Sequence, residues 1–169
     1  MVYYIAQFAG VLVTVGAIVS MQLKQKKHIL PLHIMMNICG AINILLLDKF
    51  GTGVVINLVA VAQVLLSMWH DHKNTEPSKK EIAAFFVVYM ACGLISFHSW
   101  LDILPIIAVI FYLFAVFQKD EQKLRCFMLG NGVSWLIYHS VLGSTVVFSQ
   151  IASIISALAG LYRYRKQKK

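Results

Sequence analysis

Amide, imidazole and aromatic side chains recur inside the long apolar stretches of this sequence, where each polar group needs a hydrogen-bonding partner. Asn57 lies in one such stretch. Asn131 and Tyr138 lie on one helical stripe of a later stretch, and Trp135 and His139 lie on the next stripe. Amides donate and accept hydrogen bonds, while an indole ring offers a flat apolar surface. This combination predicts a cavity for an uncharged small molecule such as a sugar or a nucleoside.

Other apolar stretches add candidates at helical spacing. Thr14 belongs to a stripe of polar and small residues that begins at Gln7, and Asn37 to a stripe that begins at His33. Ser149 opens a row of small residues, for which close packing of helices is the alternative interpretation. The predicted cavity-lining residues are Thr14, Asn37, Asn57, Asn131, Trp135, Tyr138, His139 and Ser149.

Other kinds of chemistry find little support in the sequence. The segment His70-Asp71-His72 offers metal ligands close together, but no third ligand stands at a suitable spacing. The three cysteines are odd in number and each lies in an apolar run, which argues against a disulfide framework. No nucleophile stands beside a base, and no glycine-rich phosphate loop occurs. We therefore expect no enzymatic activity, no metal site and no cofactor.

Composition identifies the elements that position these side chains as membrane-spanning helices. Hydrophobic residues make up 59% of the chain and charged residues 13%, against about 25% charged residues in an ordinary soluble domain. The charges cluster between apolar runs long enough for a helix to cross roughly 30 Å of hydrocarbon. The expected spans, all helical, are residues 3–22, 30–47, 53–69, 82–98, 101–117, 125–142 and 145–162.

The distribution of Lys and Arg predicts the orientation of these spans. Of the 15 basic residues, 14 lie in the first, third and fifth connections and in the carboxyl-terminal tail, while Lys49 lies on the other side. Cytoplasmic loops retain positive charge, so we expect a periplasmic N-terminus and a cytoplasmic C-terminus. The net charge of +8 is then a topology signal and a contact with membrane lipids, and we expect no nucleic-acid partner.

A short phrase occurs twice in the chain. G51-T-G-V-V-I-N57 is similar to G143-S-T-V-V-F-S149, 92 positions later. This offset superposes the first three spans on the last three, so that Asn57 corresponds to Ser149. We expect two parallel three-helix units, residues 1–72 and 99–169, joined by a loop and a linker helix at 73–98. In transporters built this way the site lies at the interface of the units.

The segments W135-L-I-Y-H-S140 and L45-L-L-D-K-F-G-T-G-V-V-I-N57, followed by the basic tail, resemble the YgjV family of bacterial inner membrane proteins. That resemblance covers nearly the whole chain and implies a location in a bacterial inner membrane. The plan of three, one and three helices is similar to that of SWEET and PnuC-type transporters. In SWEET-like proteins an Asn of the third span contacts the substrate, and Asn57 matches it. The chain lacks the proline-glutamine pair of SWEET proteins, which argues against a sugar.

The expected function is facilitated transport of a small polar solute, with alternating access produced by rocking of the two units. We expect spans that contain no Asp or Glu, whereas carriers driven by protons or sodium usually bury a carboxylate; we therefore expect an uncoupled facilitator. The alternative is a non-transporting membrane protein that retains a ligand as a receptor does, or that packs against a partner. The sequence leaves open the identity of the solute and the choice between a monomer and a homo-oligomer.

Overall fold

The computed structural model describes residues 1–22, 26–48, 51–75, 77–116 and 121–167. Within these ranges the chain forms helices and turns and no strand. Seven α-helices and one short 3₁₀-helix follow one another along the chain: α1 (Val2–Gln22), α2 (Lys26–Asp48), α3 (Thr52–His72), α4 (Lys79–Ile95), η1 (Trp100–Asp102), α5 (Ile103–Val116), α6 (Glu121–Val141) and α7 (Val147–Gln167). The all-α prediction is confirmed, and each expected span corresponds to one helix.

The helix boundaries differ from the expected spans where local hydrogen bonding decides them. Helix α4 ends at Ile95, three residues early; Ser96 is its C-cap, and the Ser96 backbone N–H makes the last helical bond, to Cys92 O. A capped 3₁₀ turn then precedes α5, in which the side chain of Ser99 accepts from Leu101 N. Pro105 lies in the first turn of α5, where a missing N–H costs the helix nothing.

Three helices are long and apolar enough to cross a membrane by themselves, through the windows Val2–Val19, Leu30–Leu47 and Thr52–His72. Among the remaining described helices, Trp100–Phe114 and Val147–Ala159 are shorter apolar segments. Large apolar side chains, such as the 64% exposed Phe8, cover the outside of the bundle. An apolar exterior of this extent suits lipid rather than water. The prediction of seven crossings goes beyond these three helices and stays a prediction.

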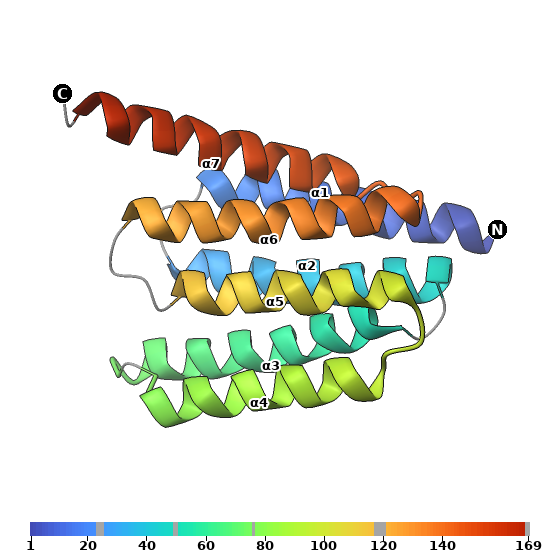
Figure 1. Cartoon of the computed structure of the whole chain (residues 1–169), viewed down its shortest axis with the longest axis horizontal. Helices are drawn as coiled ribbons and strands as arrows, with labels where there is room; N and C mark the ends of the chain where they lie inside the picture. The colour runs from blue at the N-terminus through green and yellow to red at the C-terminus, as the bar shows by residue number, and fades with distance from the viewer. Residues whose placement is uncertain (23–25, 49–50, 76, 117–120, 168–169) are drawn as a thin grey trace.

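Successive helices run in opposite directions, so that the chain termini lie at opposite ends of the bundle (Figure 1). Helix α2 packs between α1 and α3, and α6 packs between α5 and α7. These two groups meet where α1 contacts α7 and where α3 contacts α5, while α4 lies against α3 and α5. The contacts are compatible with two three-helix units and a linker helix, whose boundaries at residues 72 and 98 stay a prediction.

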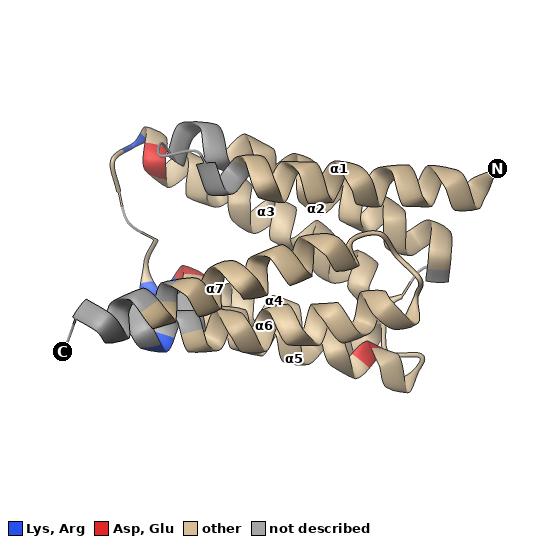
Figure 2. Ribbon diagram, turned by 90° about the horizontal axis from the view of Figure 1, so that it is seen from above, with Lys and Arg blue, Asp and Glu red and all other residues tan. Residues whose placement is uncertain are grey.

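In the part of the chain that the structure describes, charged residues lie at the two ends of the bundle (Figure 2). Lys73 follows the end of α3, Lys79 and Lys80 open α4, and Lys123 lies in the first turn of α6; these helix ends lie at the end of the bundle that holds the C-terminus (Figure 1). Asp102 lies at the opposite end, in η1, where it bonds to the start of α3. The tan middle of the bundle between them is the part that lipid would surround. Which end faces the cytoplasm stays a prediction from the positive charge.

Candidate functional site

A cavity of about 210 Å³ lies inside the bundle, and all seven helices contribute to its wall. Its lining combines amides, imidazoles and phenols with small and branched apolar residues. The lining residues are Val13, His33, Met36, Asn37, Gly40, Ile56, Asn57, Ala60, Gln63, Val64, Tyr89, Val109, Tyr112, Asn131, Trp135, His139, Val146 and Gln150. No Asp, Glu, Lys or Arg belongs to this described lining, so the cavity is polar but carries no fixed charge.

Five of the eight predicted site residues line this cavity: Asn37, Asn57, Asn131, Trp135 and His139. The three amides are oriented by backbone carbonyls. Asn37 Nδ2 donates to His33 O, and Asn57 Nδ2 donates to Gly53 O, each at 2.8 Å and within its own helix. Asn131 Nδ2 donates across to Ala108 O of α5, also at 2.8 Å.

Trp135 and His139 form an aromatic wall of the cavity. Their rings stack with centroids 5.5 Å apart and an interplanar angle of 23°. The His139 side chain is almost completely buried, and its Nδ1 has no hydrogen-bond partner among the described residues. A buried nitrogen without a partner costs free energy in the folded protein.

Three predicted residues lie outside the cavity lining. Thr14 Oγ1 donates to Gly10 O and to Thr145 O, and therefore joins α1 to the start of α7. Ser149 Oγ turns back to Val146 O of its own chain segment at 2.8 Å. Tyr138 is fully buried in an apolar cluster, on the stripe next to Trp135. The pairing of Asn57 with Ser149 in the repeat therefore does not give them equal places at the cavity.

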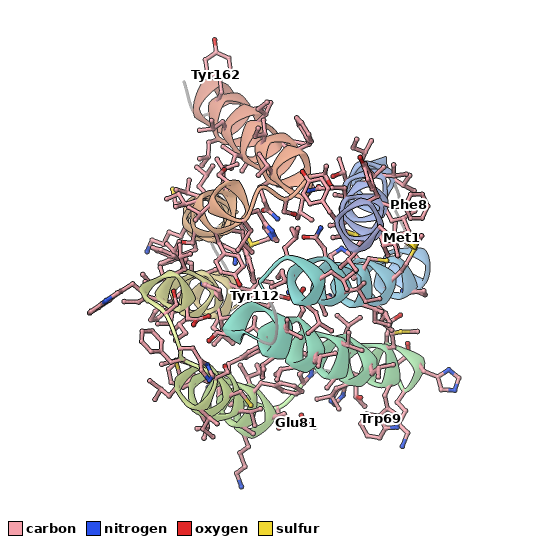
Figure 3. All side chains as sticks on the ribbon, turned by 90° about the vertical axis from the view of Figure 1, so that its right-hand side faces the viewer. Met1, Phe8, Trp69, Glu81, Tyr112 and Tyr162 are labelled. Carbon is pink, nitrogen blue, oxygen red and sulfur yellow. The ribbon has the colours of Figure 1, made fainter. Side chains whose placement is uncertain are left out.

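Five further polar residues of the lining were not among the predicted site residues: His33, Gln63, Tyr89, Tyr112 and Gln150. Tyr89 of α4 donates its hydroxyl to Gln63 Oε1 of α3 at 2.7 Å. Tyr112 of α5 lies near the centre of the bundle when it is viewed from the end, whereas Met1 and Tyr162 lie on its outside (Figure 3). A tyrosine in the middle of an apolar run is the signal that could have found both phenols.

Hydrogen bonds tie α1 and α2 to the turn between α6 and α7, close to the N-terminal end of the bundle. Gln7 Nε2 donates to Gly143 O at 2.7 Å, and Gln7 Oε1 accepts from Thr145 N at 2.9 Å. Asn43 Nδ2 donates to Ala6 O at 2.7 Å, and its Oδ1 accepts from Ser144 Oγ at 2.6 Å. We call Gln7, Asn43, Ser144 and Thr145 the N-terminal latch.

A buried carboxylate joins α3 to the segment before α5 at the same end. Asp102 is 3% exposed; its Oδ1 accepts from Thr52 N at 3.1 Å, and its Oδ2 accepts from His98 N and Ser99 N at 2.9 Å each. The expectation of carboxylate-free spans overlooked this residue, which opens the fifth expected span. Three backbone N–H groups donate to its oxygens, so the carboxylate acts as a cap at the end of the bundle. It does not line the cavity.

The His70-Asp71-His72 segment closes α3 and meets the start of α4. His70 Nδ1 lies 2.7 Å from Thr75 Oγ1, and its Nε2 lies 3.3 Å from Glu81 Oε1. Ser78 and Glu81 form a capping box, and the hydrogen bonds from Ser78 to the Glu81 carboxylate, with a smaller contribution from His70, lower the Glu81 pKa. Among the described residues, no three His, Cys, Asp or Glu side chains gather as a metal site.

Comparison with known proteins assigns the chain to a family. A family model described as a bacterial inner membrane protein, Imp-YgjV, matches residues 4–168, which is nearly the whole chain. No match was found among curated proteins or among solved structures. The apolar helices and uncharged bundle interior fit that description. The chain belongs to the YgjV family of bacterial inner membrane proteins.

Proposed function

We propose that the protein facilitates passage of a small polar solute across the bacterial inner membrane by alternating access to the cavity. The observation that carries this proposal is a polar, uncharged cavity to which every helix of the bundle contributes. If this space served packing alone, we would expect apolar side chains to fill it. Polar side chains inside a membrane cost free energy unless they bind a ligand or a partner.

The position of the cavity suits a mechanism in which two helix groups rock against each other. Its wall combines Asn37 and Asn57 from the first three helices with Asn131, Trp135 and His139 from the last three. A relative rotation of the two groups would expose these side chains to one side of the membrane and then to the other. Placement of the site between two such units is common in secondary transporters.

The hydrogen bonds between the two helix groups fit a state of that mechanism in which the N-terminal end of the bundle is closed. Residues 1–72 are joined to residues 99–169 by side-chain hydrogen bonds of Gln7, Thr14, Ser144 and Thr145 and by the Asp102–Thr52 pair. These bonds lie toward the N-terminal end of the bundle. Breaking these bonds would open that end, so they favour a state in which access comes from the lysine-bearing end.

The test is solute flux into proteoliposomes that contain the purified protein. Radiolabelled D-glucose and adenosine would represent a sugar and a nucleoside. We expect flux above protein-free liposomes for at least one solute, and its loss in Asn57→Ala and Trp135→Ala. Ser140→Ala is the control, because Ser140 bonds only to Leu136 O of its own helix and lies outside the cavity. Unchanged flux in both cavity variants would refute the site.

Binding without flux would favour the receptor-like alternative. In that outcome the purified protein would bind a solute, the Asn57→Ala variant would lose binding, and proteoliposomes would show no uptake. The cavity would then be a retention site, and the N-terminal latch would be a permanent closure rather than a gate. Absence of both binding and flux would refute the function of the cavity altogether.

A further inference from the structure

The three asparagines of the cavity are oriented by their amino groups, so that their side-chain oxygens remain available to accept hydrogen bonds from a ligand. Each Nδ2 donates to a backbone carbonyl, at His33, Gly53 or Ala108. A carbonyl oxygen can bond only to the amino side of an amide, so this contact fixes the direction of the whole group. In the described chain no hydrogen bond reaches Oδ1 of Asn37, Asn57 or Asn131.

The position of the Asn57 oxygen is known from its distance to Gly40. A Cβ on Gly40 would lie 3.1 Å from Asn57 Oδ1, and Gly40 itself lines the cavity. The Asn57 oxygen therefore lies at the cavity wall between α2 and α3. The amides of Asn37 and Asn131 reach the same cavity from α2 and α6. Hydrogen-bond acceptors thus surround the space from three helices.

The lining also limits the charge of a ligand. No described lining residue is Asp, Glu, Lys or Arg. An anion would leave water without a cationic side chain to balance its charge, and a cation would leave water without a carboxylate to do so. Burying an unpaired ion costs at least several kcal/mol, or about three orders of magnitude in affinity. Both kinds of ion are therefore disfavoured against an uncharged molecule of the same size.

We propose that the cavity selects uncharged solutes rich in hydrogen-bond donors, with Asn37, Asn57 and Asn131 as the accepting groups. Hydroxyl groups of a polyol and ring N–H groups of a heterocycle supply the same chemistry. The stacked Trp135 and His139 rings add a flat surface for either kind of molecule. A volume of about 210 Å³ lies below the roughly 300–1,000 Å³ of sites for drug-sized ligands, so the solute is small. This inference rests on the cavity of the proposed function, but not on transport.

The experiment measures ligand-induced thermal stabilisation of the purified full-length protein in detergent, with two matched sets of probes. D-glucose is compared with the cation glucosamine and the anion gluconate, which differ from it mainly in charge. Uracil is compared with 1,3-dimethyluracil, which keeps the ring but lacks its N–H donors. We expect stabilisation by glucose or by uracil, and little by glucosamine, gluconate or dimethyluracil. The two arms distinguish a hydroxyl-bearing from an N–H-bearing solute.

Variants connect the selectivity to the asparagines. Asn37→Ala and Asn57→Ala should each weaken binding of the stabilising probe by about 2- to 10-fold, the value of one neutral hydrogen bond. Ser140→Ala should bind as the unaltered protein does. If one alanine variant fails to fold, the other still tests the assignment, because each amide bonds only within its own helix.

The outcomes separate this inference from the proposed function. Preference for gluconate or glucosamine, equal stabilisation by uracil and dimethyluracil, or binding unaffected by both asparagine variants would overturn the inference. Stabilisation by none of the probes up to millimolar concentration would overturn it too. Selective binding of an uncharged donor without flux in proteoliposomes would uphold the inference and refute transport.

Discussion

Thr145 is bonded to Gln7 twice, although the two residues lie far apart in the chain. The Thr145 backbone N–H donates to Gln7 Oε1 at 2.9 Å, and Thr145 Oγ1 donates to Gln7 O at 2.8 Å. Gln7 Nε2 reaches Gly143 O on the other side of the same turn. The first helix is thereby fixed to the turn before the last helix, and in the proposed mechanism access to the cavity from this end requires these bonds to break.

Gln7→Ala should open the N-terminal end more often. It removes both side-chain hydrogen bonds of Gln7; at about 0.5–1.5 kcal/mol each, this shifts the population roughly 5- to 150-fold. The measurement is the labelling of Ala60→Cys, a cavity position, by an impermeant maleimide added from the N-terminal side. A background without the native cysteines is used, and Ser140→Ala is the control. Equal labelling in both variants would contradict the role of the latch as a gate.

Asp102→Asn should destabilise the protein although it alters few atoms. One carboxylate oxygen becomes an amino group that faces backbone N–H donors, because all the bonds to Asp102 come from N–H groups. A loss of about 2–3 kcal/mol is expected, which corresponds to roughly 4–12 °C in thermal unfolding temperature. The exposed Asp71→Asn variant is the control and should shift little. A shift in Asp102→Asn no larger than that of Asp71→Asn would refute the capping role.

Gly10→Ala and Thr145→Ala should be coupled. A Cβ on Gly10 would overlap Thr145 Oγ1, and it would also lie 3.1 Å from Asn43 Nδ2. Removing the Thr145 hydroxyl relieves the first overlap, so the double variant should lose less stability than the sum of the single variants, by about 0.5–3 kcal/mol. Gly130→Ala is a matched overpacking control, because its Cβ would meet the Phe111 ring at 2.9 Å, away from the latch. Its combination with Thr145→Ala should be additive, and additivity of the Gly10 pair would be the contrary result.

The turn between α3 and α4 should lose stability in acid. The folded protein lowers the Glu81 pKa below its ordinary value of 4.5, mainly through Ser78 and secondarily through His70. The stabilisation is therefore complete above that value and is lost as the pH falls through the lowered pKa. Glu81→Gln should reduce the acid sensitivity of hydrogen exchange at the amides of this turn. The exposed Asp71→Asn serves as a charge-matched control. Identical pH profiles for Glu81→Gln and the unaltered protein would speak against the capping box.

His139→Phe should stabilise the empty protein and weaken ligand binding by no more than about 10-fold, the value of one neutral hydrogen bond. His139 buries an Nδ1 that has no partner in the described chain, at a cost of about 1–3 kcal/mol. A phenyl ring keeps the stack on Trp135 without that nitrogen. The measurement is the thermal unfolding temperature with and without the probe that stabilises the unaltered protein. A less stable variant that binds the probe with unchanged affinity would show that the nitrogen serves the fold and not the ligand.

The sequence determined the helical elements and their environment. Apolar runs between clustered charges predict membrane-spanning helices, because a segment in lipid must satisfy its backbone hydrogen bonds within itself. Helices α1 to α7 follow those runs. The sequence also identified several residues of the cavity lining, among them Asn57, Asn131 and Trp135. Polar groups within a membrane helix are costly, and this cost indicates a role for them. These properties depend on residues close in the chain, which periodicity reveals.

Only the tertiary structure decided which polar groups meet. Ser149 and Asn57 correspond in the predicted repeat, yet Ser149 bonds to its own chain at Val146 O while Asn57 lines the cavity. Asp102 falls within an expected span, 101–117, but is a buried cap at the bundle end, because Thr52 from a distant helix brings it a third N–H donor. The rotation of each helix about its axis and the contacts between distant turns arise from packing across the bundle. A single helix pattern carries no information about that packing, and for this reason the latch was visible only in three dimensions.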